Sequence, residues 1–178
     1  GVNEETETYG RFVSSHLTEE NGFRMFNIVL YEPEIPPNTG NIIRVCANTG
    51  ARLDLVEPLG FELDDARLKR AGLDYRELAE VRRYPGWENW LDAHPEMPLW
   101  AFSTKGGRAH HEARFTPGDA LIFGPESRGL PETVLKRIGS DRVLRLPMLP
   151  QSRSMNLSNA VAVGLYEALR QQEFAGLG

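Results

Sequence analysis

The chain has 178 residues, of which 40% are hydrophobic and 25% are charged, a balance typical of one soluble globular domain. No apolar run reaches the ~20 residues that a membrane-spanning helix needs, and a single cysteine, Cys46, excludes an intrachain disulfide and a cysteine-based zinc cluster. The formal net charge of −5 argues mildly against a nucleic-acid partner, because Lys and Arg make the contacts to phosphates. We expect a cytoplasmic protein with no membrane partner, in which Cys46 is a core residue.

Residues 1–24 carry most of the acidic excess. They hold five of the 25 acidic and two of the 20 basic residues, which leaves 20 acids and 18 bases in 25–178. A near-neutral body can still present a basic face. The Glu, Thr and Ser content of 1–24 predicts a disordered N-terminal extension, so we place the folded domain at 25–178.

The first half of that domain alternates short apolar runs with helical patterns. Phe26–Tyr31 has the length of a strand, and the prolines after it cannot continue a strand ladder. A helix is predicted to begin at Asn38, a favourable N-cap, and to end at Gly50, a favourable C-terminal cap. Arg44 should lie on the side of this helix that faces away from the core. A second strand is predicted over Arg52–Glu57.

The most basic part of the chain follows this second strand. A short helix is predicted over Leu63–Gly72, and six basic residues lie in and after it: Arg67, Lys69, Arg70, Arg76, Arg82 and Arg83. Two interpretations stay open. The charges form a solvent-exposed face balanced by neighbouring aspartates, or they contact the backbone of a nucleic acid.

The second half continues the alternation. A helix is predicted over Trp87–His94, and strands over Pro98–Thr104, Leu121–Gly124 and Arg142–Leu146. Alternating strands and helices predict an α/β fold, a mostly parallel sheet with helices on both faces. The chain ends in a long amphipathic helix, whose apolar stripe has four-residue spacing: Leu157, Val161, Leu165 and Leu169.

Two polar loops follow the last two predicted strands. The second loop leads into the long helix, whose first backbone N–H groups lack partners and can hold a ligand. Ligands of α/β sheets gather beyond the carboxyl ends of the strands, so the two loops predict one site. The glycine fingerprint of dinucleotide-binding folds is missing, which disfavours an oxidoreductase of that kind. The neighbours His110 and His111 should point to opposite sides of the chain, so we expect no metal site.

Three stretches carry a family resemblance. They are Asn38–Arg44, Leu121–Pro131 and Leu144–Asn159, with the sequences NTGNIIR, LIFGPESRGLP and LRLPMLPQSRSMNLSN. These stretches resemble the motifs of the SPOUT (trefoil-knot) RNA 2'-O-ribose methyltransferases. From Met25 to the last helix, the chain is similar to the small single-domain branch of that family.

The resemblance implies a reaction and its partners. The methyl donor would be S-adenosyl-L-methionine, without a metal. The acceptor would be the ribose 2'-hydroxyl of the wobble nucleotide of a tRNA, cytidine or modified uridine at position 34, reached through the anticodon stem-loop. The similarity of Arg67–Tyr75 to a family segment raises the weight of a tRNA contact by the basic stretch. The alternatives are another tRNA or rRNA position and a non-catalytic RNA-binding module of the same fold.

The resemblance also implies a topology and an assembly. The C-terminal segment would thread through a preceding loop to form a deep trefoil knot, which sequence physics alone would not propose. We expect a homodimer through the final helix and the helix that begins at Asn38, because the final helix has a broad apolar surface. Tyr166 on the final helix is expected to serve in packing.

The family resemblance further implies two sets of site residues. Those expected to bind the cofactor are Phe102, Gly124, Glu126, Leu146, Met148 and Ser154. Those expected to take part in catalysis are Arg44, Arg153, Ser154 and Asn156. Ser154 and Asn156 are also natural helix caps, which is a sufficient structural role. Glu126 is expected to contact the cofactor or Arg44, with an ion pair to Arg128 as the simpler alternative.

The four catalytic candidates differ in chemistry. Because a guanidinium stays protonated, Arg44 is expected to stabilise charge that develops on the ribose oxygen, and its action as a base is the alternative. Arg153 would grip a phosphate with its planar fork of donors.

Overall fold

The computed structural model describes residues 26–64, 70, 72–74, 77–78 and 80–178. In this part of the chain, seven strands form one sheet in the order β3-β2-β1-β6-β4-β7-β5, and each neighbouring pair is parallel. The strands are β1 Asn27–Tyr31, β2 Arg52–Val56, β3 Val81–Tyr84, β4 Leu99–Phe102, β5 Arg108–Ala109, β6 Ala120–Phe123 and β7 Val143–Arg145. The prediction of an α/β fold with a mostly parallel sheet is confirmed.

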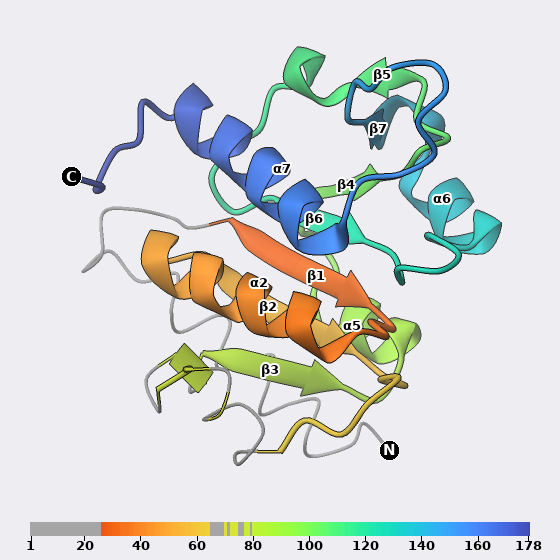
Figure 1. The fold of residues 1–178 in the computed structure, drawn as a ribbon. Coiled ribbons are helices and arrows are strands. Elements are labelled where there is room, and N and C mark those ends of the chain that lie inside the picture. The colour runs from red at the N-terminus through yellow and green to blue at the C-terminus, as the bar shows by residue number, and fades with distance from the viewer. Residues whose placement is uncertain (1–25, 65–69, 71, 75–76, 79) are drawn as a thin grey trace.

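Helices cover both faces of this sheet. They are α2 Pro36–Thr49, α5 Trp87–Ala93, α6 Glu132–Ile138 and α7 Leu157–Gln171, with short 3-10 turns at His110–Glu112 and Ser140–Arg142. Figure 1 shows α2 and α7 side by side on one face, where they contact each other, while α5 and α6 cover the other face. No described helix has both the length and the apolarity to cross a membrane.

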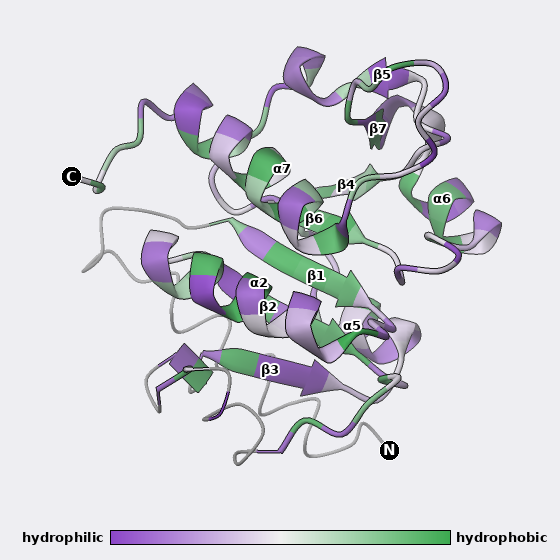
Figure 2. Ribbon diagram, viewed as in Figure 1, coloured by the Kyte–Doolittle hydropathy of each residue, from purple (hydrophilic) through white to green (hydrophobic). Residues whose placement is uncertain are grey.

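The sheet has an apolar core on each side because successive strand residues point to opposite faces. Ile28 and Leu30 of β1 pack in the cluster beneath α2 and α7, where Cys46 is also buried as predicted. Val29 packs in the cluster beneath α5 and α6. In Figure 2 the strand β1 is largely hydrophobic, whereas the outer sides of the helices are mixed or hydrophilic. The strands are therefore buried on both faces, as expected of a parallel sheet.

The helix α2 begins two residues before the predicted start. Its N-cap is Ile35, and Pro36 and Pro37 occupy the first turn, where a missing N–H costs nothing. The prediction that Asn38 is the cap was therefore wrong, and Asn38 lies inside the first turn. The predicted end is confirmed, since Gly50 takes the left-handed conformation with φ 75°.

The strand β3 was not predicted, because its sequence contains the neighbours Arg82 and Arg83. Arg82 is only 6% exposed, so its proposed contact with a nucleic-acid backbone was wrong. Arg83 points to solvent and pairs with Glu57 at 2.7 Å. The predicted helix over Leu63–Gly72 lies largely outside the described residues, as do Arg67, Lys69, Arg76 and the N-terminal extension.

Candidate active site

A cavity of about 580 Å³ opens at one end of the sheet, within the usual range for small-molecule sites. It lies beyond the carboxyl ends of four strands. Its walls come from the segments that follow β1, β4, β6 and β7, together with the start of α7. This is the edge of an α/β sheet where ligands are expected.

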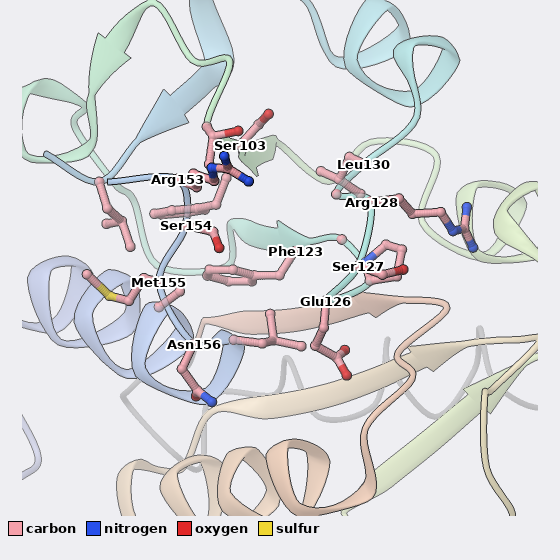
Figure 3. Close-up of a pocket in the computed structure, with 18 of the residues that line it drawn as sticks. Ser103, Phe123, Glu126, Ser127, Arg128, Leu130, Arg153, Ser154, Met155 and Asn156 are labelled. Carbon is pink, nitrogen blue, oxygen red and sulfur yellow. The ribbon is translucent and has the colours of Figure 1, made fainter. Parts of the chain in front are cut away.

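All six predicted cofactor-binding residues line this cavity: Phe102, Gly124, Glu126, Leu146, Met148 and Ser154. Of the four predicted catalytic residues, Arg153, Ser154 and Asn156 line it as well, and Arg44 does not. Figure 3 shows Arg153 and Ser154 on the segment before α7, across the cavity from Glu126 and Ser127. The structure thus brings together residues that lie far apart in the sequence.

The loop after β6 folds tightly at Gly124. A Cβ atom built there would lie 2.3 Å from the backbone nitrogen of Leu130 and 2.4 Å from the carbonyl carbon of Gly129. The loop is closed by a hydrogen bond from the Gly129 N–H to the Pro125 carbonyl, 2.9 Å long. Because these neighbours are backbone atoms that cannot rotate away, only glycine fits at position 124.

A second close approach joins the loop after β4 to the strand β7. A Cβ atom at Gly106 would lie 2.4 Å from the carbonyl carbon of Leu144, and the Ser103 N–H donates to the Leu144 carbonyl at 2.9 Å. The loop that carries Ser103, Thr104 and Lys105 to the cavity is therefore held against β7 by backbone contacts.

Two stacked rings form an apolar floor. Phe102 and Phe123 are buried, with ring centroids 4.5 Å apart and an angle of 15° between the rings. The helix α7 packs directly on them at Gly164, where a Cβ atom would lie 2.9 Å from the Phe102 ring. The floor can hold a flat or apolar part of a ligand, and it is fixed by the packing of α7.

Glu126 joins the two loops at the ends of β1 and β6. Its carboxylate accepts the backbone N–H groups of Glu34, at 3.1 and 3.2 Å, and of Ile35. In return the Glu34 carboxylate accepts the backbone N–H of Ser127 at 2.8 Å and its hydroxyl at 2.7 Å. The backbone hydrogen bond from Ser127 is the main cause that lowers the pKa of Glu34. We call this reciprocal pair the carboxylate clasp.

Neither of the two arginine contacts predicted for Glu126, with Arg44 or with Arg128, forms in the structure. Arg128 pairs instead with Glu32 at 3.0 Å. The sequence could not reveal this, because the clasp joins residues more than 90 positions apart.

Asn156 caps α7, as one of its two predicted roles required. Its Oδ1 accepts the backbone N–H of Ser158 at 2.9 Å, and its Nδ2 donates to Asn38 Oδ1 at 3.0 Å. Asn156 thus fixes the start of α7 against the first turn of α2. Ser154 is not the cap, which corrects the other capping prediction, and its side chain is exposed at the cavity.

Asn38 was not predicted as a residue of the site, although it lines the cavity. Its side chain is buried and accepts a hydrogen bond from Asn156. The signal was present, because Asn38 opens the first motif, but the expected cap role explained it sufficiently. Ser103, Thr104 and Lys105 also line the cavity. These residues follow β4 at the carboxyl edge of the sheet, where ligands of such folds gather.

Arg44 lies on the solvent side of α2, as predicted, outside this cavity. Its Nε donates to the Glu77 carboxylate at 2.9 Å, and its Nη2 donates to the carbonyl of Gly72. The side chain remains 46% exposed. Arg44 is therefore held by a segment that forms no part of the cavity wall.

Within the described residues, no group of three or more His, Cys, Asp or Glu side chains is arranged to hold a metal ion. Cys46 is buried, and burial raises the pKa of its thiol far above the ordinary value. The thiol therefore stays protonated and does not act as a nucleophile.

The family model of the SpoU rRNA methylases matches residues 25–166. The chain belongs to this family. The resemblance seen in the three motifs is thereby confirmed, and the cavity lies where those motifs meet.

This SpoU family member has curated relatives of nearly the same extent. It is 64% identical to the tRNA (cytidine(34)-2'-O)-methyltransferase of Saccharophagus degradans over 152 residues, which cover 85% of this chain and 99% of the relative. It is 56% identical to the protein of the same name from Escherichia coli, with 85% and 97% covered.

Solved structures agree with the SpoU family assignment. One, which concerns the 2-OH methylation of cytidine or uridine 34 on tRNA, is 47% identical with a TM-score of 0.78, covering 85% of this chain and 98% of that chain. The SpoU methyltransferase AviRb of Streptomyces viridochromogenes, solved with the cofactor AdoMet, is 26% identical with a TM-score of 0.69, covering 86% and 60%.

Proposed function

We propose that this protein is a tRNA 2'-O-methyltransferase. It transfers a methyl group from S-adenosyl-L-methionine to the ribose 2'-hydroxyl of the wobble nucleotide, cytidine or modified uridine at position 34. The observation that carries the proposal is the gathering of all six motif-derived cofactor residues in one cavity, in a chain 64% identical to a relative with this named activity. The protein would act in the cytoplasm, on the anticodon stem-loop.

The residues that line the cavity suit this cofactor. The close backbone contact at Gly124 keeps the loop after β6 folded at the cavity wall. The apolar side chains of Phe102, Leu146 and Met148 can cover the adenosine, while backbone groups of the loops and the exposed Ser154 offer polar contacts. When bound, the cofactor supplies a methyl group on a positively charged sulfur. These contacts need no metal, so we propose binding without one.

The remaining residues would act on the ribose and its phosphate. As the 2'-hydroxyl releases its proton to water, its oxygen gains negative charge, and a fixed guanidinium would stabilise that charge. We assign this role to Arg44 and phosphate binding to Arg153, which is exposed at the cavity mouth. Ser154 and Asn156 would complete the polar rim.

We further propose a homodimer. Arg44 lies outside the cavity of its own chain. It would reach a ribose bound at the cavity of a second protomer if α2 of one protomer faces the cavity of the other. Apolar side chains exposed on and after α7 support such an interface: Val163 at 41%, Tyr166 at 45% and Phe174 at 38% exposed. A monomeric mass in light scattering at micromolar concentration would count against it.

The deep trefoil knot expected from the resemblance is also part of the proposal. The close backbone contacts at Gly106 and Gly124 are compatible with a chain drawn through a tight loop. An experimental structure in which the segment between β7 and α7 passes beside that loop, without crossing it, would refute the knot.

The experiment that tests the function is methylation of unmodified and native tRNA by the purified protein, followed by mass spectrometry of the nucleosides and of fragments containing the anticodon. We expect a methyl group on the ribose at position 34, and none when that nucleotide carries a 2'-deoxyribose. A methyl group at another position would support the wider alternative of a different tRNA or rRNA site. Binding of RNA without any methyl transfer would support the non-catalytic alternative.

A further inference from the structure

We propose that Glu77 is a positioning residue that orients Arg44 for the reaction. This inference rests on the proposed function, because that function gives Arg44 its role. Glu77 was not among the predicted site residues.

Two acceptors fix the guanidinium plane of Arg44. Nε donates to Glu77 Oε2 at 2.9 Å, and Nη2 donates to the Gly72 carbonyl. A guanidinium is planar and carries five N–H donors. Two anchors on neighbouring donors set the direction of the plane and leave the other donors available to an incoming ligand. The Arg44 side chain is 46% exposed, whereas that of Glu77 is 17% exposed, so the anchor is the more protected partner.

The anchor is itself held in place by its own segment. The Asp74 carboxylate accepts the backbone N–H of Glu77 at 2.9 Å, as in a helix cap. Leu73 is buried in the core cluster beneath α2, and Leu78 packs against that cluster. Apolar contacts on both sides of Asp74 thus tie the segment to the domain while its polar groups face Arg44.

Gly72 adds a second fixed acceptor. Its φ of +81° is a conformation that favours glycine, and in it the carbonyl meets Arg44 Nη2. The sequence Gly-Leu-Asp at 72–74 therefore supplies a turn, a core contact and a cap in three residues. A tRNA contact would not account for these three residues, whereas the hold on Arg44 does.

The ion pair between Arg44 and Glu77 is half-exposed on the Arg44 side. Such a pair contributes little to folding, so its loss should hardly change the melting temperature. Orientation is different, because a catalytic group that is displaced by ~1 Å can lose on the order of a hundredfold in rate. A positioning role therefore predicts a loss of rate without a loss of stability.

The first test is Glu77→Gln, measured by single-turnover methylation at saturating tRNA and cofactor. We expect the rate to fall by about tenfold or more, with cofactor affinity within twofold of wild type and an unchanged melting temperature. The matched control is Glu57→Gln, which breaks the exposed pair of Glu57 with Arg83 on another segment and should keep the wild-type rate. If Glu77→Gln does not fold, Glu77→Asp withdraws the carboxylate by one methylene and serves in its place.

The second test asks whether Glu77 acts through Arg44. In an Arg44→Ala background, whose slow residual rate is followed in long incubations with excess enzyme, Glu77→Gln should cause no further loss, since residues that work as a unit are not additive. A wild-type rate in Glu77→Gln, a higher rate, or the same fold-loss with and without Arg44 would each overturn the inference. If the wild-type protein transfers no methyl group, the proposed function fails and the inference with it. If wild type is active, Arg44→Ala is inactive and Glu77→Gln is fully active, only the inference fails.

Discussion

The cavity walls and the surroundings of Arg44 are built in different ways. The walls are held by close backbone contacts at Gly124 and Gly106 and are joined by the carboxylate clasp. Arg44 is held by a side-chain ion pair and one carbonyl on a segment that does not line the cavity. We therefore expect cofactor binding and activation of the ribose to depend on separate regions, which substitutions should separate.

The two regions should also differ in how they tolerate change. Backbone contacts leave no room for a larger residue, so the cavity should respond in stability and affinity together. A half-exposed ion pair should respond in rate alone.

Gly124→Ala should have the largest effect on the cavity. The new methyl group would meet the Leu130 nitrogen and the Gly129 carbonyl carbon, so the loop must open, at a cost of about 1–3 kcal/mol or more. We expect calorimetry to detect no cofactor binding at concentrations that saturate wild type. The control is Gly107→Ala, where a Cβ atom has no neighbour within 4 Å. Wild-type affinity in Gly124→Ala would show that the cavity does not depend on the close backbone contact at this position.

Glu126→Gln should have a smaller effect in the same region. An amide offers one acceptor oxygen in place of two and brings an N–H₂ group against the N–H groups of Glu34 and Ile35. We expect a loss of about 1 kcal/mol in stability, since hydrogen bonds to charged groups are among the stronger ones, and faster hydrogen exchange at these two amides. Glu132→Gln, which removes the exposed partner of Lys105, should change neither. Unchanged exchange in Glu126→Gln would show that the clasp does not hold the loops together.

Acid should weaken the fold through a group that belongs to neither region. His94 is buried at the C-terminal end of α5, where its Nδ1 donates to the Trp90 carbonyl at 2.8 Å. Burial lowers its pKa below the ordinary 6.5, although the charge of Asp54 opposes this. Between the two values the unfolded chain binds more protons than the folded one. Stability should therefore rise with pH through this window and fall below about pH 6.5, by at most ~1.4 kcal/mol per pH unit for one proton.

Denaturant unfolding at pH 7.5 and 5.5 measures this loss. In His94→Asn the amide can replace the donor to Trp90 but cannot titrate, so the loss of stability on acidification should be smaller. His110, whose pKa burial also lowers, contributes with the same sign and remains in both proteins. An equal loss in wild type and His94→Asn would contradict the assignment.

The sequence predicted the cavity better than it predicted the contacts within it. Motif positions identified six of the residues that line it, because loops at the carboxyl ends of parallel strands meet wherever the sheet order brings them together. The strand β3 was missed because Arg82, buried beside Asp54 in the strand register, breaks the apolar pattern that indicates a strand.

The contacts depend on geometry that local patterns do not contain. The clasp joins residues more than 90 positions apart, and Arg44 finds Glu77 across 33 positions. The start of α2 was misplaced because Pro36 and Pro37 suit the first turn of a helix as well as they suit a loop. Such pairings become visible only when the fold has placed both partners.

We expect Arg44 to serve the chemistry and not the cofactor site. Single-turnover methylation by Arg44→Ala at saturating tRNA, with cofactor affinity measured on the same sample, tests this role. Methyl transfer should be lost while the affinity stays within twofold of wild type, and Arg44→Lys should rescue little, because a point charge does not reproduce a planar fork. A wild-type rate of methyl transfer in Arg44→Ala, or a loss of rate that merely follows a loss of cofactor binding, would contradict it.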